Sequence, residues 1–137
     1  MEKKKVILAV VLLLIVIIAL TLAYSKLFIL GVKEIEFSIK VGENIGLNVD
    51  TDKLYFGTIP MGGGESNRNI FIQNEKHSLA RVNINSYGDK AGWLYVSKNN
   101  FFLKKGEGQN IELKIKVPNG AELGSYEGKI LIVFTRF

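Results

Sequence analysis

The sequence predicts an all-β domain, a single antiparallel β-sandwich, preceded by one N-terminal transmembrane α-helix. The helix is predicted by an unbroken apolar run from Val6 to Ala23, which follows directly after three lysines. The strands are predicted by the rest of the 137-residue chain, in which short segments alternate apolar and polar residues. A period of two is typical of half-buried strands, and this part of the sequence has no segment with the period of an α-helix.

The apolar run is long enough for a membrane anchor. At about 1.5 Å per residue, a helix of this length reaches roughly 30 Å, the thickness of a bilayer hydrocarbon core. A secretory signal has a shorter apolar centre of about 7 to 15 residues, and a buried helix of a soluble protein carries a polar stripe that this run lacks. An uncleaved anchor is therefore expected. A cleaved leader is the alternative, because Thr21-Leu22-Ala23 fits a weak cleavage site.

The charges around the run predict its orientation. Lysines at the extreme N-terminus favour a cytoplasmic N-terminus and an extracytoplasmic C-terminal part, although Lys26 and Lys33 reduce the asymmetry. We expect a basic cytoplasmic tail at residues 1–5, a transmembrane anchor with a juxtamembrane segment at residues 6–31, and an extracytoplasmic β-sandwich domain at residues 32–137. That domain is large enough for one core, and without cysteine it has no disulfide.

The first strand of the domain is expected from residue 34 to residue 41. The same alternation predicts further strands around residues 45–49, 54–56, 70–72, 82–84, 111–117 and 130–134, with glycine- or proline-containing turns between them. On the strand at 111–117, Glu112, Lys114 and Lys116 are expected to face water. The apolar residues between them then face the opposite sheet.

Aromatic side chains supply much of the remaining bulk of the expected core. Trp93 is expected inside the domain. Phe101 and Phe102 are adjacent on a predicted strand, so their side chains point to opposite faces. One of these two rings is therefore expected to be exposed.

The spacing of strands and glycine turns resembles that of a known family. The segments concerned are Leu54-x-Phe56-Gly57-x-Ile59-x-x-Gly62, Ile70-x-Ile72-x-Asn74, Val82-x-Ile84, Phe102-Leu103 with Gly106, Ile111-x-Leu113-x-Ile115-x-Val117-Pro118 and Gly124-x-Tyr126-x-Gly128-x-Ile130-x-Ile132. They cover about residues 53–134 and resemble immunoglobulin-like sandwiches of the ASPM, SPD-2, Hydin and major-sperm-protein type, with their prokaryotic surface relatives. The resemblance implies an immunoglobulin-like β-sandwich that serves as a binding or spacer module and has no catalytic residues.

Tyr126 lies in a segment that resembles a tyrosine corner, with glycines two residues before and two residues after it. In that motif the tyrosine hydroxyl bonds to backbone a few residues upstream. We therefore expect the hydrogen-bond partner of Tyr126 between Pro118 and Leu123.

Catalytic and cofactor sites have little support in the sequence. With a single histidine, His77, and no cysteine, neither a Ser-His-Asp nor a Cys-His arrangement can form. Asp50 and Asp52 could ligate a hard cation, but the spacing of a calcium loop is missing and a solvated Asx turn is the better account. No catalytic residue, metal or cofactor is expected. An acid–base enzyme using Asp50, Asp52 or Glu65 is the remaining enzymatic alternative.

Two other features have simple structural explanations. Gly62-Gly63-Gly64 lacks the lysine of a phosphate-binding loop and precedes a strand, so a hairpin connection is expected there. His77 lies on a polar turn, where a surface imidazole is the default and a pH switch is the alternative.

Charge and aromatic residues indicate the kind of partner. Of the formal net charge of +5, +3 belongs to the anchor and its flanks, and the remaining +2 is too small to indicate nucleic acid. Phe101, Phe102, Lys104 and Lys105 form a basic aromatic segment that could bind a partner. Lysines that protect an exposed sheet edge explain the same segment equally well. No small-molecule substrate is expected.

These features predict a membrane-anchored extracytoplasmic binding or structural module, which docks envelope, surface-layer or surface-filament proteins through a sheet edge or an aromatic patch. In this anchored form the chain resembles accessory proteins of archaeal surface filaments, whose outer β-sandwiches contact the stator or the surface layer. The lipid bilayer is the other expected partner, and homo-oligomers are compatible with the same features. The alternative function is that of a secreted or periplasmic sandwich-type assembly factor with a cleaved leader.

Overall fold

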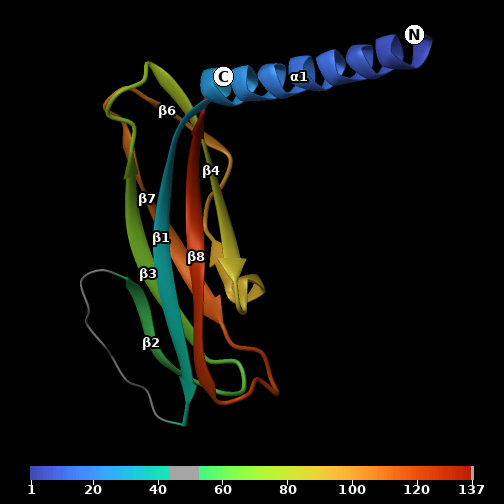
Figure 1. The fold of residues 1–137 in the computed structure, drawn as a ribbon. Coiled ribbons are helices and arrows are strands. Elements are labelled where there is room, and N and C mark those ends of the chain that lie inside the picture. Colours follow the sequence, from blue (N-terminus) through green and yellow to red (C-terminus); the bar gives the residue numbers. More distant parts are fainter. Residues whose placement is uncertain (44–52, 137) are drawn as a thin grey trace.

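The computed structural model describes residues 1–43 and 53–136 of the chain. Within them lie α1 (Glu2–Phe28), β1 (Ile29–Gly42), β2 (Leu54–Pro60), β3 (Glu65–Gln73), β4 (Leu79–Gly88), the 3-10 helix η1 (Ala91–Trp93), β5 (Leu94–Val96), β6 (Phe101–Lys104), β7 (Gly108–Lys116) and β8 (Gly124–Thr135). The strand predicted around residues 45–49 lies outside the described residues. A mostly-β chain with an N-terminal apolar helix is therefore confirmed (Figure 1).

The strands form a five-stranded sheet in the order β2-β1-β8-β4-β6 and a three-stranded sheet in the order β3-β7-β5. Among the described strands, every pair is antiparallel except β1 with β2, which run parallel. The prediction of purely antiparallel pairing is therefore wrong for the five-stranded sheet. Alternation of apolar and polar residues specifies the two faces of a strand but not its direction, so it could not reveal the parallel pair.

Both sheets contribute side chains to one hydrophobic core. On β7, Leu113 is fully buried, whereas Glu112 and Lys116 are exposed and Lys114 is partly exposed, which confirms the predicted faces of this strand. In the five-stranded sheet, the ring of Phe37 packs edge-on against that of Phe56, with centroids 6.1 Å apart. The core comprises Phe37, Ile39, Val41, Phe56, Ile59, Ile70, Ile72, Val82, Ile84, Leu94, Phe101, Leu103, Ile111, Leu113, Ile115, Val117, Ile130 and Ile132.

Strand β1 begins at Ile29, directly after the last residue of α1 and five residues before the predicted start at Glu34. The alternation that marks β1 fails in this early part, because Gly31 and Lys33 occupy the positions that continue the inward-facing series of Ile35. The pairing nevertheless continues, with Ile29 opposite Thr135 on β8. Figure 1 shows α1 leaving the end of β1 and extending away from both sheets, and no residue of α1 is buried.

The expectation that Trp93 lies inside is only partly met. Its side chain is half-buried at the end of η1, where it packs against the core, and the buried position is taken by Leu94. The indole ring meets the ring of Tyr126 edge-on at 5.5 Å, and Lys90 Nζ lies 5.4 Å from the centroid of each ring. Trp93 therefore covers the end of the core together with a neighbouring aromatic ring and a cation.

The glycine-rich segment after β2 does not connect a hairpin as predicted, because β2 and β3 belong to different sheets. Gly62 and Gly63 have φ values of 82° and 96°, a backbone region that side chains disfavour, so glycine allows the chain to turn here from one sheet to the other. Side chains of β3 then bond to the backbone of β2. Ser66 Oγ donates to the Phe56 carbonyl at 2.7 Å, and Arg68 Nε donates to the Tyr55 carbonyl at 2.7 Å.

The predicted partner of Tyr126 is confirmed. Its hydroxyl donates to the backbone carbonyl of Glu122 at 3.0 Å, within the interval expected from the sequence. The bond joins β8 to the connection that precedes it, and the same ring packs against Trp93. The residue therefore fixes the start of β8 through one polar and one apolar contact.

Replacing Tyr126 by Phe should lower the free energy of unfolding by about 1 kcal/mol, because the ring contact remains and one hydrogen bond is lost. Thermal unfolding of the full chain in detergent, followed by circular dichroism, measures this change. Tyr95→Phe is the matched control, since the Tyr95 side chain is 57% exposed and should tolerate the loss of its hydroxyl. An unchanged melting temperature for Tyr126→Phe would contradict a structural role of the hydroxyl.

Asn74 is the buried polar residue of the described chain, with 2% of its surface exposed. Its Nδ2 donates to the carbonyls of His77 at 2.7 Å and Leu103 at 2.9 Å, and its Oδ1 accepts from the His77 N–H at 3.1 Å. The Asn74 backbone also accepts from Gly106 and donates to Glu107. The Asn74 side chain therefore joins the turn after β3 to the end of β6, and its backbone joins it to the turn that follows β6.

Asn74→Ala should lower the free energy of unfolding by about 2 to 3 kcal/mol, because buried carbonyls lose their donor. Asn74→Asp should be no better at neutral pH, since a carboxylate cannot donate to the two carbonyls. Urea unfolding monitored by the fluorescence of Trp93, the single tryptophan, measures both variants. Wild-type stability in Asn74→Ala would show that water replaces the amide without cost.

Candidate docking edges

The predicted basic aromatic segment lies on β6, an edge strand of the five-stranded sheet. Phe101 is 6% exposed and belongs to the core, whereas Phe102 is 46% exposed, which confirms that the two rings point to opposite faces. Lys104 and Lys105 are exposed. The surface part of this segment is therefore Phe102 with the two lysines, and Phe101 instead holds the strand on the core.

The end of the β6 edge is occupied by the chain itself. The Lys104 N–H donates to the Glu107 carboxylate at 2.8 Å, and the Lys104 carbonyl accepts from the Glu107 N–H at 3.0 Å. The following residue, Lys105, donates its N–H to the Ser78 carbonyl at 3.1 Å. The two Glu107 contacts satisfy the Lys104 backbone groups that a partner strand would otherwise use, whereas the Lys105 contact continues the pairing of β6 with the β4 side. The geometry favours the alternative that these lysines protect the edge.

The opposite side of the molecule is closed in another way. There β2 forms the other edge of the five-stranded sheet, and β3 forms an edge of the three-stranded sheet. The bonds from Ser66 and Arg68 to β2 carbonyls bridge the two edges, so side chains take the place of a backbone ladder. This corner therefore offers fewer backbone groups to a partner.

Beyond the end of β6, no described strand pairs with the edge of β4, although Ser86 Oγ donates to the Ala91 carbonyl of η1 at 3.2 Å. Strand β6 pairs with β4 only from Leu79 to Val82. Two residues further along, the side chain of Asn99 takes the place of a strand, because its Oδ1 accepts from the Ile84 N–H and its Nδ2 donates to the Ile84 carbonyl, both at 2.7 Å. In the described part of the chain, residues 85–88 of β4 have no strand partner on this side.

A cleft of about 450 Å³ lies between this part of β4 and strand β5 of the other sheet. We call it the β4–β5 cleft. Tyr87 and Tyr95 line it and are 53% and 57% exposed, so each offers a flat apolar ring with a polar end. The other lining residues are Ile84, Asn85, Ser86, Leu94, Val96 and Asn99.

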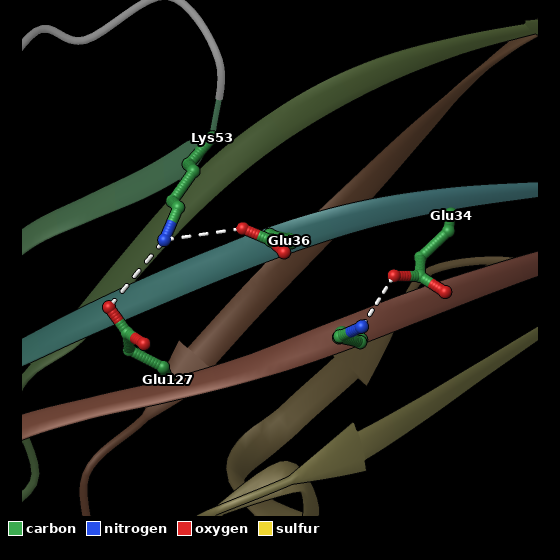
Figure 2. Close-up of polar contacts among 5 residues, drawn as sticks. Glu34, Glu36, Lys53 and Glu127 are labelled. Carbon is green, nitrogen blue, oxygen red and sulfur yellow. Dashed lines mark ion pairs between the residues drawn. The ribbon is translucent and has the colours of Figure 1, made fainter.

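Ion pairs occupy the outer face of the five-stranded sheet. Lys53 Nζ lies 3.2 Å from Glu36 and 3.7 Å from Glu127, and Lys129 Nζ lies 2.7 Å from Glu34. Figure 2 shows Lys53 between the two glutamates. The hydrogen bond to Glu36 is the main cause that raises the pKa of Lys53, and the hydrogen bond to Glu34 raises the pKa of Lys129. These exposed pairs connect the residue before β2 with β1 and β8, and the two lysines offset all but one of the three carboxylates.

The other residues singled out in the sequence do not come together as a site. Asp50 and Asp52 lie outside the described residues. Glu65 is paired with Lys114 and Lys116, each at 3.6 Å. The half-buried His77 belongs to the turn held by Asn74. Among residues 1–43 and 53–136, no group of three His, Cys, Asp or Glu side chains could hold a metal ion.

A scan against protein-family models, a search of curated proteins and a search of solved structures found no match to this chain. Function must therefore be inferred from the site itself, because a fold alone does not specify a function. Within the site, the sequence did not predict the open β4 edge. The turn at residues 88–92 was predicted, but its spacing carries no sign that the chain changes sheets there.

Proposed function

We propose that this chain is a single-pass membrane protein that presents an immunoglobulin-like β-sandwich outside the cell membrane and docks an extended segment of another envelope protein. The observation that carries the proposal is the uncovered stretch of β4 in the β4–β5 cleft. Envelope, surface-layer and surface-filament proteins are the partner classes that lie within reach of such an anchor. The two sheets around one core and the tyrosine contact at the start of β8 support the sandwich assignment.

The properties of α1 support the anchor. It is 27 residues long and apolar enough to cross a membrane. Its large apolar side chains are exposed around its whole circumference, with no polar stripe that would suit water. Lipid is the environment that removes this surface from water without another protein. The lysines at positions 3–5 then remain on the cytoplasmic side.

The docking mode follows from the backbone of β4. An extended partner segment would bond to the open edge of residues 85–88 and add a strand to the five-stranded sheet. Its side chains would lie against Tyr87 and Tyr95, which flank the β4–β5 cleft. Backbone pairing would supply the affinity, and the two tyrosine rings would select the side chains.

The anchor predicts an intact N-terminus. The chain purified from membranes should have the mass of all 137 residues and should resist extraction at alkaline pH, because the helix is inserted in the bilayer. Intact-protein mass spectrometry and a carbonate wash measure these two properties. A mature N-terminus near Tyr24 would instead favour a secreted assembly factor with a cleaved leader.

The docking proposal predicts that one tyrosine controls partner capture. A photo-crosslinking residue at position 85 should capture an envelope protein in intact cells, and Tyr95→Ser should reduce the yield about tenfold or more, because truncation of a central aromatic anchor costs much of the affinity. Western blotting and mass spectrometry of the crosslinked product measure the yield.

Phe102→Ser is the matched control, since it removes a comparably exposed ring from the β6 edge. Capture should be unchanged in that variant. A loss in Phe102→Ser with normal capture in Tyr95→Ser would move the docking site to β6 and refute the β4–β5 cleft. Recovery of no envelope component from the wild-type chain would refute the docking function.

A further inference from the structure

A second cleft lies where the helix joins the sheets. The Arg136 N–H after β8 donates to the Phe28 carbonyl at the end of α1 at 2.7 Å, so the C-terminal end of the chain is bonded to the helix terminus. Because β1 starts at Ile29 without a linker, residues around this junction stay close to the end of α1. If α1 spans the membrane as proposed, they lie at the level of the lipid headgroups.

The cleft forms because the inner face of β1 is not filled at this end. The inward-facing series of Ile35 continues with Lys33 and then Gly31, instead of large apolar residues. The β1–β8 register shifts between Ile29 and Gly31, which leaves Leu30 as an extra residue in the strand. The result is a cleft of about 410 Å³ whose lining includes Leu30, Lys33, Lys76, His77, Ile132 and Phe134. We call it the junction cleft.

The junction cleft has cations on an apolar floor. Lys33 and Lys76 line it, and Arg136 lines an adjoining cleft of about 420 Å³ that shares Leu30, Lys76 and His77 with it. Glu75 is the acidic side chain in the lining. In the described part of the chain, the ion pairs involve Lys53, Lys114, Lys116 and Lys129, and none of them engages Lys33, Lys76 or Arg136.

Lys33 is unusual for its position. An apolar residue there would extend the core beyond Ile35 and Phe37, whereas an ammonium group at the mouth of the core must be solvated or bound. Local conflicts between a residue and its place in a fold tend to occur at functional sites. The Lys33 side chain is exposed, so its ammonium group is in contact with water and is accessible to an anionic partner at the helix end of β1.

We propose that the junction cleft binds the phosphate headgroup of an anionic membrane lipid. The ammonium groups of Lys33 and Lys76 and the guanidinium group of Arg136 donate to phosphate oxygens, while Leu30 and Phe134 contact the apolar part next to the headgroup. A soluble anion would use the cations but not the apolar floor. This inference rests on the proposed membrane anchor, and it identifies the junction cleft as the contact that holds the domain against the bilayer surface.

The test uses the full chain in detergent micelles with phosphatidylglycerol or phosphatidylcholine of the same acyl composition, and counts bound lipid by native mass spectrometry. Phosphatidylglycerol should be retained about fivefold or more above phosphatidylcholine, because a single cation near an anionic lipid surface contributes about that factor. Inorganic phosphate in roughly 100-fold excess should leave the lipid bound, since phosphate alone lacks the apolar contacts.

The variant K33Q/K76Q/R136Q should lose the preference, whereas K53Q/K114Q/K116Q, which removes three ion-paired cations elsewhere, should keep it. If circular dichroism shows that the first variant is unfolded, K76Q and R136Q alone carry the test, because both side chains are exposed, and each should lose about fivefold. Equal retention of the two lipids, an unchanged preference in the variants, or displacement by free phosphate would refute the proposal.

The anchor is tested separately on the same variants by alkaline extraction of membranes. A chain that is extracted refutes the proposed anchor. A chain that stays in the membrane without preferring phosphatidylglycerol refutes the lipid site alone. The two failures are thus distinguishable.

Discussion

The pairing of β1 with β8 organises the described fold. The two strands remain antiparallel partners from Ile29 opposite Thr135 to Val41 opposite Gly124, and they lie in the middle of the five-stranded sheet. Their inner faces supply Phe37, Ile39, Ile130 and other core residues. Because β1 also continues α1 without a linker, the same pair carries the core at one end and the helix at the other (Figure 1). The junction cleft lies at the helix end of this pair.

The unequal size of the two sheets explains why open surfaces remain. A three-stranded sheet cannot cover the whole inner face of a five-stranded one, so part of the larger sheet must be covered in other ways. On one side, Ser66 and Arg68 bridge β3 to β2 through backbone carbonyls. On the other side, Asn99 covers Ile84, and none of the described strands pairs with residues 85–88 from that side. At the helix end, Gly31 and Lys33 leave the inner face of β1 unfilled.

Local patterns predicted the faces of the strands well. The burial of Leu113 beside exposed Glu112 and the partner of Tyr126 depend on sequence neighbours, so period and motif sufficed. The parallel pairing of β1 with β2 depends on distant contacts, and the sequence carries no signal for strand direction. Trp93 shows the same limit, because its half-buried position depends on Tyr126 more than thirty residues away.

The candidate sites were harder to predict than the fold. The sequence reveals the basic aromatic segment from Phe101 to Lys105. Its position on an edge strand agrees with the alternative in which its lysines protect that edge. The β4–β5 cleft was not visible, because it arises where the chain passes between sheets at Asn99. The junction cleft was hidden for a related reason. In the sequence Lys33 has the position of a charge flanking the helix, and only the register of β1 shows that it lies at the mouth of the core.

Strand β4 connects the two proposed contacts and limits where a partner can be. Leu79, at the start of β4, lines the cleft that adjoins the junction cleft. The unpaired edge of β4, near Gly88, faces the β4–β5 cleft. At about 3.3 Å per residue, a strand of this length spans at most roughly 30 Å. A lipid contact at the junction would fix the direction of β4 relative to the membrane, since a paired strand is far stiffer than a flexible linker. The docking edge would then be held at a set height above the bilayer, and a partner must offer its extended segment within that distance.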